Sequence, residues 1–106
     1  MKPGRLRLIA ALVACCTMAV PADAATIQIV MQNLEISPAE VSAKVGDTIE
    51  WTNKDIVAHT ATARNGDFDV ALAPNKTGSF VLKKEGSVDY YCRFHPNMKA
   101  TLKIEP

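Results

Sequence analysis

The stretch from residue 90 to residue 100 constrains this chain more than any other. It reads Tyr-Tyr-Cys-Arg-Phe-His-Pro-Asn-Met-Lys-Ala and places Cys92, His95 and Met98 three residues apart in turn. If a tight loop joins two flanking strands here, a thiolate, an imidazole and a thioether with this spacing can all face one point. The pattern therefore predicts a metal site. The chain contains only two histidines, so His59 is the candidate for the fourth ligand.

These four side chains favour copper over zinc. Thiolate and thioether sulfur suit Cu(I), and imidazole serves both oxidation states, so two His, one Cys and a weak axial Met are typical of copper electron-transfer sites. Zinc normally takes Cys, His or carboxylate ligands in its fourth position, so Met98 counts against it. A buried Met or Cys by itself is common in a protein core, but the full spacing favours a metal site. We expect one copper ion, held by His59, Cys92, His95 and Met98.

At these residues the chain resembles the cupredoxin family, and within it the small blue copper proteins of the amicyanin and plastocyanin type. The C-x-x-H-x-x-M loop with Pro96 directly after the His is most similar to the amicyanin loop. The segment Gly-Asp-Thr-Ile-Glu-Trp-Thr-Asn-Lys-Asp-Ile-Val-Ala-His, which ends at His59, resembles the segment that carries the first copper histidine. The similarity covers residues 34–105, with departures at Arg93, Phe94 and Asn97 and a shorter stretch before the Cys strand.

The resemblance implies a carrier that shuttles single electrons by Cu(II)/Cu(I) cycling, and not an enzyme. It also implies that Asn53 ties the His59 loop to the Cys92 strand. In this family the loop histidine, here His95, presents an exposed edge inside an apolar patch where redox partners dock. The candidates for that patch are Val57, Ala58, Phe94 and Pro96.

The resemblance suggests redox proteins as partners, with a dehydrogenase as donor and a c-type cytochrome as acceptor. Arg93 and Lys99 flank the loop and could steer an acidic partner. We expect the protein to act as a monomer.

The first 24 residues have the pattern of a secretory signal peptide. A basic start is followed by an apolar run from Leu8 to Val20 and an Ala-Asp-Ala end, and the run is shorter than the roughly twenty residues of a membrane span. We expect cleavage after Ala24, a single cupredoxin domain over residues 25–106, and a periplasmic location. An alternative is a lipoprotein anchored through Cys15, because Leu-Val-Ala-Cys resembles a lipoprotein cleavage box.

The remaining 82 residues would carry nine Lys plus Arg and ten Asp plus Glu. This near-neutral balance argues against a nucleic-acid partner, which would favour a basic face. Cys92 would be the single cysteine of an exported chain and could form no internal disulfide, so its thiol needs another role. Metal ligation supplies that role.

The region after residue 25 shows the short alternating runs of an all-β protein. We expect strands near residues 26–31, 34–38, 41–45, 48–52, 60–63, 77–82, 88–92 and 98–105. Residues 67–75 are expected to form an irregular connection. Side chains alternate between the two faces of a strand, and this alternation predicts that Cys92 and Met98 point into the core. These features predict a two-sheet Greek-key β-sandwich.

Other functions are possible for these residues. A cysteine hydrolase would need an exposed, activated thiolate, whereas the strand pattern buries Cys92. Multicopper oxidases and copper nitrite reductases need many more histidines. A copper carrier or delivery protein would use the same four ligands and remains the alternative, although a delivery site tends to be open and rich in Met.

Overall fold

The computed structural model describes residues 23–106, and residues 1–22, with most of the expected signal peptide and Cys15, lie outside the described part. Nine strands occupy the described region. They are β1 (Thr26–Gln32), β2 (Glu35–Ser37), β3 (Glu40–Lys44), β4 (Thr48–Asn53), β5 (His59–Ala63), β6 (Asp69–Leu72), β7 (Thr77–Val81), β8 (Gly86–Tyr91) and β9 (Lys99–Glu105). Within these residues no helix has the length and apolar character that crossing a membrane requires.

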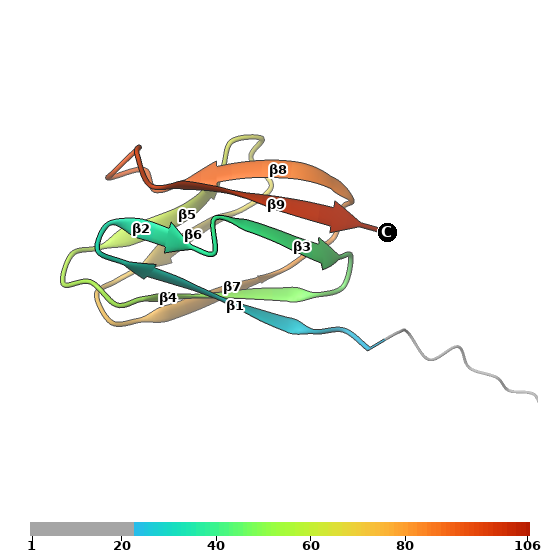
Figure 1. The fold of residues 1–106 in the computed structure, drawn as a ribbon, viewed down its shortest axis with the longest axis horizontal. Coiled ribbons are helices and arrows are strands. Elements are labelled where there is room, and N and C mark those ends of the chain that lie inside the picture. Colours follow the sequence, from blue (N-terminus) through green and yellow to red (C-terminus); the bar gives the residue numbers. More distant parts are fainter. Residues whose placement is uncertain (1–22) are drawn as a thin grey trace, which may run out of the picture.

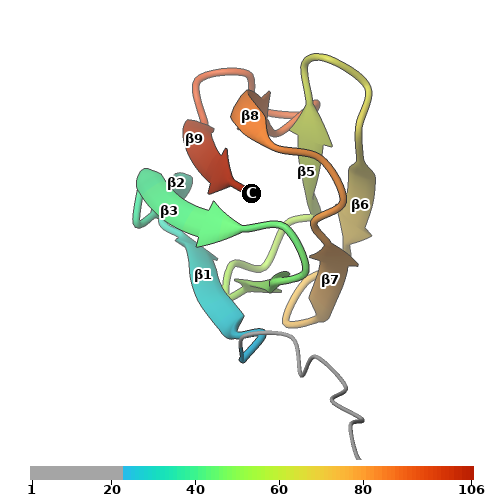
Figure 2. The ribbon, with the colours of Figure 1, turned by 90° about the vertical axis from the view of Figure 1, so that its right-hand side faces the viewer.

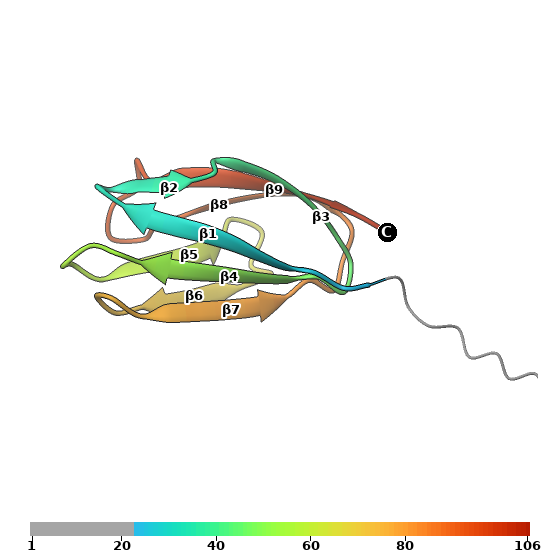
Figure 3. The same ribbon diagram turned by 60° about the horizontal axis from the view of Figure 1, so that its bottom comes forward.

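The strands form two sheets that pack face to face, which confirms the predicted β-sandwich. One sheet has the order β2-β1-β4-β7 and the other the order β3-β9-β8-β5-β6. Figure 3 shows the first sheet from its outer side, and Figure 2 shows both layers from one end. The chain changes sheets repeatedly, and the pairs β1·β4 and β3·β9 are parallel while the other pairs are antiparallel. The consecutive strands β8 and β9 form an antiparallel hairpin in the interior of the larger sheet.

The core follows from alternation along the strands. In β9 every second residue is buried, namely Ala100, Leu102 and Ile104, and Met98 continues this face before the strand begins. In β8 the buried positions are Val88 and Tyr90, and Cys92 follows on the same face. Both inward directions agree with the sequence analysis.

An aromatic cluster joins the two sheets. Trp51 on β4 lies 5.6 Å from Tyr90 on β8 and 5.4 Å from Phe68, measured between ring centroids. The indole Nε1 of Trp51 donates a hydrogen bond of 3.2 Å to the hydroxyl of Tyr90 across the sandwich. Burial raises the pKa of Tyr90 to about 12, so the phenol stays neutral. The cluster thus fixes the strand that leads directly to Cys92.

The expectation of an irregular connection over residues 67–75 is wrong. Residues Asp69–Leu72 form β6, an edge strand that pairs antiparallel with β5. Its sequence Asp-Val-Ala-Leu carries a weak strand preference, and pairing with β5 supplies the stabilisation that the local sequence lacks. The loops that follow β1, β4, β6 and β8 all gather at the left end of Figure 1.

Replacement of Tyr90 by Phe tests the inter-sheet hydrogen bond. Tyr90→Phe leaves the indole N–H of Trp51 buried without this acceptor, so we expect a loss of about 1–3 kcal/mol in the free energy of unfolding. Tyr91→Phe is the matched control, because Tyr91 is half-buried on the opposite face, and it should change stability by less than about 0.5 kcal/mol. Urea denaturation measures both, and equal small losses would show that the bond contributes little.

Candidate metal centre

The loop between β8 and β9 brings three candidate ligands together through its own backbone. The N–H of His95 donates to the carbonyl of Cys92 at 3.2 Å, and the N–H of Met98 donates to the carbonyl of His95 at 2.8 Å. The N–H of Cys92 in turn donates to the carbonyl of Met98 at 3.0 Å and closes the loop. Two successive turns, each closed by a hydrogen bond between residues three apart, therefore explain the spacing of Cys92, His95 and Met98.

His59 opens strand β5 and completes a compact cluster. Its Nδ1 lies 3.8 Å from Cys92 Sγ, and His95 Nδ1 lies 3.6 Å from the same sulfur. The donor atoms of these three residues all lie within 4.8 Å of one another. Metal bonds of about 2.0 Å to nitrogen and about 2.3 Å to sulfur, at about 120°, would separate nitrogen and sulfur by about 3.7 Å. The two nitrogen–sulfur distances thus match those expected around a trigonal metal ion.

The cluster is closed to solvent except at one edge. Cys92 and His59 are 0% exposed, Met98 is 2% exposed, and His95 is only partly buried. The structure therefore joins His59, Cys92 and His95 in one site, and places the buried Met98 in the same loop. Assignment of Met98 as the fourth ligand stays a prediction.

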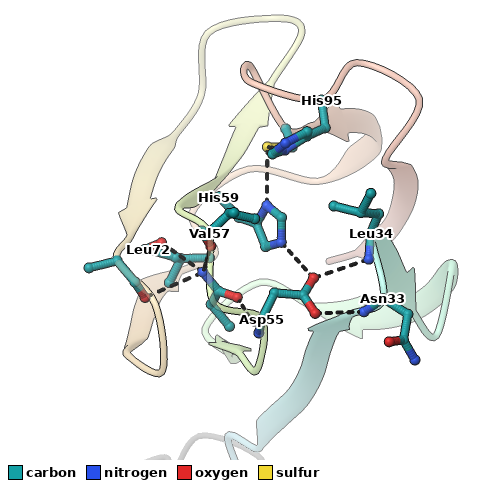
Figure 4. Close-up of polar contacts among 10 residues, drawn as sticks. Asn33, Leu34, Asp55, Val57, His59, Leu72 and His95 are labelled. Carbon is teal, nitrogen blue, oxygen red and sulfur yellow. Dashed lines mark hydrogen bonds and ion pairs between the residues drawn. The ribbon is translucent and has the colours of Figure 1, made fainter.

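Asp55 anchors the far side of the His59 ring (Figure 4). Its Oδ2 lies 2.8 Å from His59 Nε2, which leaves Nδ1 free to face Cys92. Asp55 also accepts hydrogen bonds from the backbone N–H groups of Asn33 and Leu34. The imidazole hydrogen bond, followed by that from Leu34, holds the pKa of the Asp55 carboxyl below its usual value. A carboxylate on the second ring nitrogen fixes the tautomer and orientation of a metal-binding histidine.

The resemblance implied that Asn53 ties the His59 loop to the Cys92 strand, and this prediction is wrong. The side-chain amide of Asn53 donates to the carbonyl oxygens of Val57, Leu72 and Ala73, and its oxygen accepts from the N–H of Asp55. Asn53 therefore ties the His59 loop to the β6–β7 connection and not to the Cys92 strand. Two partners of Asn53 lie at the end of β6, because Leu72 is the last residue of that strand and Ala73 follows it. Without β6 the sequence could not predict these contacts.

Thr60 makes the connection to the Cys92 segment instead. Its Oγ1 accepts a hydrogen bond of 2.9 Å from the N–H of Arg93, the residue after Cys92, and the side chain is buried. Neither Thr60 nor Asp55 was predicted from the sequence as a site residue. Their only signal was position, since Thr60 directly follows His59 and Asp55 precedes it by four residues.

Exposed apolar residues lie in the loop before His59 and in the loop that contains His95, which meet at the same end of the sandwich (Figure 1). The predicted patch residues Val57, Ala58, Phe94 and Pro96 are all exposed. Ile56, which the sequence analysis did not include, is 88% exposed. Isolated exposed hydrophobic residues are normal, but several around one partly buried histidine indicate a contact surface.

The fold and the cluster define a β-sandwich protein with a buried two-histidine, one-cysteine metal site. The family model for the Cupredoxin-like domain matches residues 5–104, and the chain belongs to this family. It is similar to amicyanin of Paracoccus versutus, with 26% identity over 81% of this chain and 68% of the relative, and to amicyanin-alpha of Methylorubrum extorquens, with 31% identity over 79% and 76%. The solved structure of a purple cupredoxin from Nitrosopumilus maritimus matches with a TM-score of 0.66 and 28% identity, over 74% of this chain and 99% of that one.

Replacement of Asn53 tests how firmly the His59 loop is held. Asn53→Ala leaves several buried backbone groups without this partner, so we expect the free energy of unfolding to fall by about 3 kcal/mol. Asn65→Ala is the control, because Asn65 is exposed and bonds only within its own turn to Asp67; its effect should stay near 0.5 kcal/mol. Similar losses in the two variants, measured by urea denaturation, would contradict this role for Asn53.

Proposed function

We propose that this protein is a type 1 blue copper protein that carries single electrons between redox partners. The observation that carries the proposal is the close approach of His59 Nδ1 and His95 Nδ1 to the sulfur of the fully buried Cys92, at 3.8 and 3.6 Å. This donor set fits copper, because it combines a thiolate and two imidazoles and offers the thioether of Met98 as a weak fourth ligand. Copper, when bound, supplies a one-electron Cu(II)/Cu(I) couple.

The chain contributes rigidity and exclusion of water. His59 is fixed by Asp55, and Cys92 is held by the turns of its own loop, so neither donor needs to move when the charge of the site changes. Burial of both side chains keeps water from the sulfur. A site with these properties suits rapid electron exchange.

Two other functions fit the geometry less well. A cysteine hydrolase needs a solvent-accessible thiolate, and Cys92 is fully buried. A copper delivery protein would favour an open, Met-rich site, whereas Met31, the other methionine of the described residues, lies in the hydrophobic core. We therefore propose an electron carrier and not an enzyme.

The proposal includes the partner surface and the location. A redox partner would dock over the patch around His95, with Arg93 and Lys99 at its rim as attractive charges for an acidic surface. Arg93 also forms an ion pair with Asp69, so part of its charge is compensated. A dehydrogenase donor, a c-type cytochrome acceptor, cleavage after Ala24 and a periplasmic monomer of residues 25–106 complete the proposal.

Mixing the reduced protein with an oxidised c-type cytochrome tests the proposal. We expect rapid cytochrome reduction with copper retained by the protein. Val57→Asp should slow the second-order rate by about tenfold, because it places in the docking patch a charge that must be desolvated and that repels an acidic partner. Val81→Asp is the control, since Val81 is 45% exposed against 42% for Val57 but lies on β7. Transfer of copper to an acceptor, with slow electron exchange, would favour a delivery protein.

A further inference from the structure

The turn between β1 and β2 is connected to His59 through hydrogen bonds to Asp55. The turn between β1 and β2 contains two consecutive left-handed residues, Asn33 with φ 57° and Leu34 with φ 60°. Asn tolerates this conformation, but a branched apolar residue such as Leu rarely adopts it and is strained there. Such strain persists only where the surrounding structure imposes it.

The Asp55 carboxylate imposes this conformation. Its Oδ1 accepts from the N–H of Asn33 at 2.8 Å, and its Oδ2 accepts from the N–H of Leu34 at 3.1 Å. Both donors point at one carboxylate only because the turn is left-handed at both positions, and hydrogen bonds to an ionised acceptor are strong enough to offset the strain. The backbone of Asp55 is itself fixed, since its N–H donates to the Asn53 side chain.

The oxygen that binds Leu34 also binds the ligand. His59 Nε2 lies 2.8 Å from Asp55 Oδ2, so turn and imidazole share one acceptor (Figure 4). The carboxylate is half-buried, with 15% of its side chain exposed, and would turn towards water if the two backbone donors moved away. No hydrogen bond among the described residues joins the turn directly to His59.

We propose that Asp55 is a positioning residue that couples the left-handed turn at Asn33 and Leu34 to the imidazole of His59. The conformation of the turn then sets the orientation of this ligand and the strength of its Nε2 hydrogen bond. Leu34 is 51% exposed at the same end of the molecule as the His95 patch. A partner that contacts Leu34 would thus reach the buried ligand through two hydrogen bonds. This inference rests on the proposed function, because His59 is taken as a copper ligand.

Direct packing is the competing route from the turn to the site. Leu34 lines a cavity of about 340 Å³ together with Asn97 and Met98. Two substitutions of Leu34 separate the routes. Leu34→Gly removes the side chain but favours the left-handed turn, whereas Leu34→Val keeps an apolar side chain but disfavours that turn more strongly than Leu does.

The test uses the full mature protein loaded with Cu(I), which is diamagnetic. Nuclear magnetic resonance measures how fast the His59 Nε2 proton exchanges with solvent, and voltammetry measures the reduction potential. Leu34→Val and Asp55→Asn should accelerate the exchange by about tenfold, as loss of a charge-assisted hydrogen bond implies. Both should also raise the potential, because an imidazole without its carboxylate partner donates less to the metal and stabilises Cu(II) less.

Leu34→Gly should leave both quantities within about twofold of the parent values, given the tolerance of Gly for this turn. Asp89→Asn controls for loss of a negative charge, since Asp89 is exposed on β8 and, among the described residues, its carboxylate accepts a hydrogen bond from Thr101 alone. A larger effect of Leu34→Gly than of Leu34→Val would show packing and overturn the coupling. An effect of Asp55→Asn without one of Leu34→Val would also overturn it. Failure of the proposed function would show elsewhere, because a parent protein without a copper site would not retain the metal and a delivery protein would lose it to an acceptor in the cytochrome experiment.

Discussion

The closed loop between Cys92 and Met98 is the constraint on which the site depends. Three backbone hydrogen bonds fold its seven residues into two turns, so that one short segment carries a thiolate, an imidazole and a thioether at intervals of three residues. The loop is held in turn by β8 and β9, whose registers run in pairs from Gly86 and Ile104 to Tyr91 and Lys99. The sandwich thus transmits its rigidity to the ligands through ordinary hairpin pairing.

The second half of the site comes from a different part of the chain and needs more support. His59 begins β5, and the loop before it is anchored by four hydrogen bonds of Asn53 and by the Asp55 carboxylate. Thr60 then joins this strand to the residue after Cys92. Polar contacts therefore hold the His59 segment and the Cys92 loop together, in a region where the metal-binding side chains interrupt the apolar packing. Each of these buried polar groups has a partner, as a stable polar site in a core requires.

The sequence predicted the approach of Cys92 and His95 and the sandwich because both have local signatures, and His59 followed because the chain has only one other histidine. Spacing of three marked the loop, and alternation marked the inward faces of the strands that hold Cys92 and Met98. Strand β6 was not predicted, because its four residues have only a weak preference for strand structure and depend on pairing with β5. The partner of Asn53 and the roles of Asp55 and Thr60 depend on how three separate loops meet. No pattern in the sequence indicates how these loops pack together, so only the structure could show these contacts.

The absorption spectrum of the mature protein loaded with Cu(II) tests the account most directly. A sulfur donor held at short range in a dry trigonal site should give intense visible charge transfer from the Cys92 thiolate to copper. We therefore expect a strongly blue protein whose colour disappears in Cys92→Ser, because a hydroxyl is neither soft nor readily deprotonated. A colourless protein that holds stoichiometric Cu(II) would contradict the account.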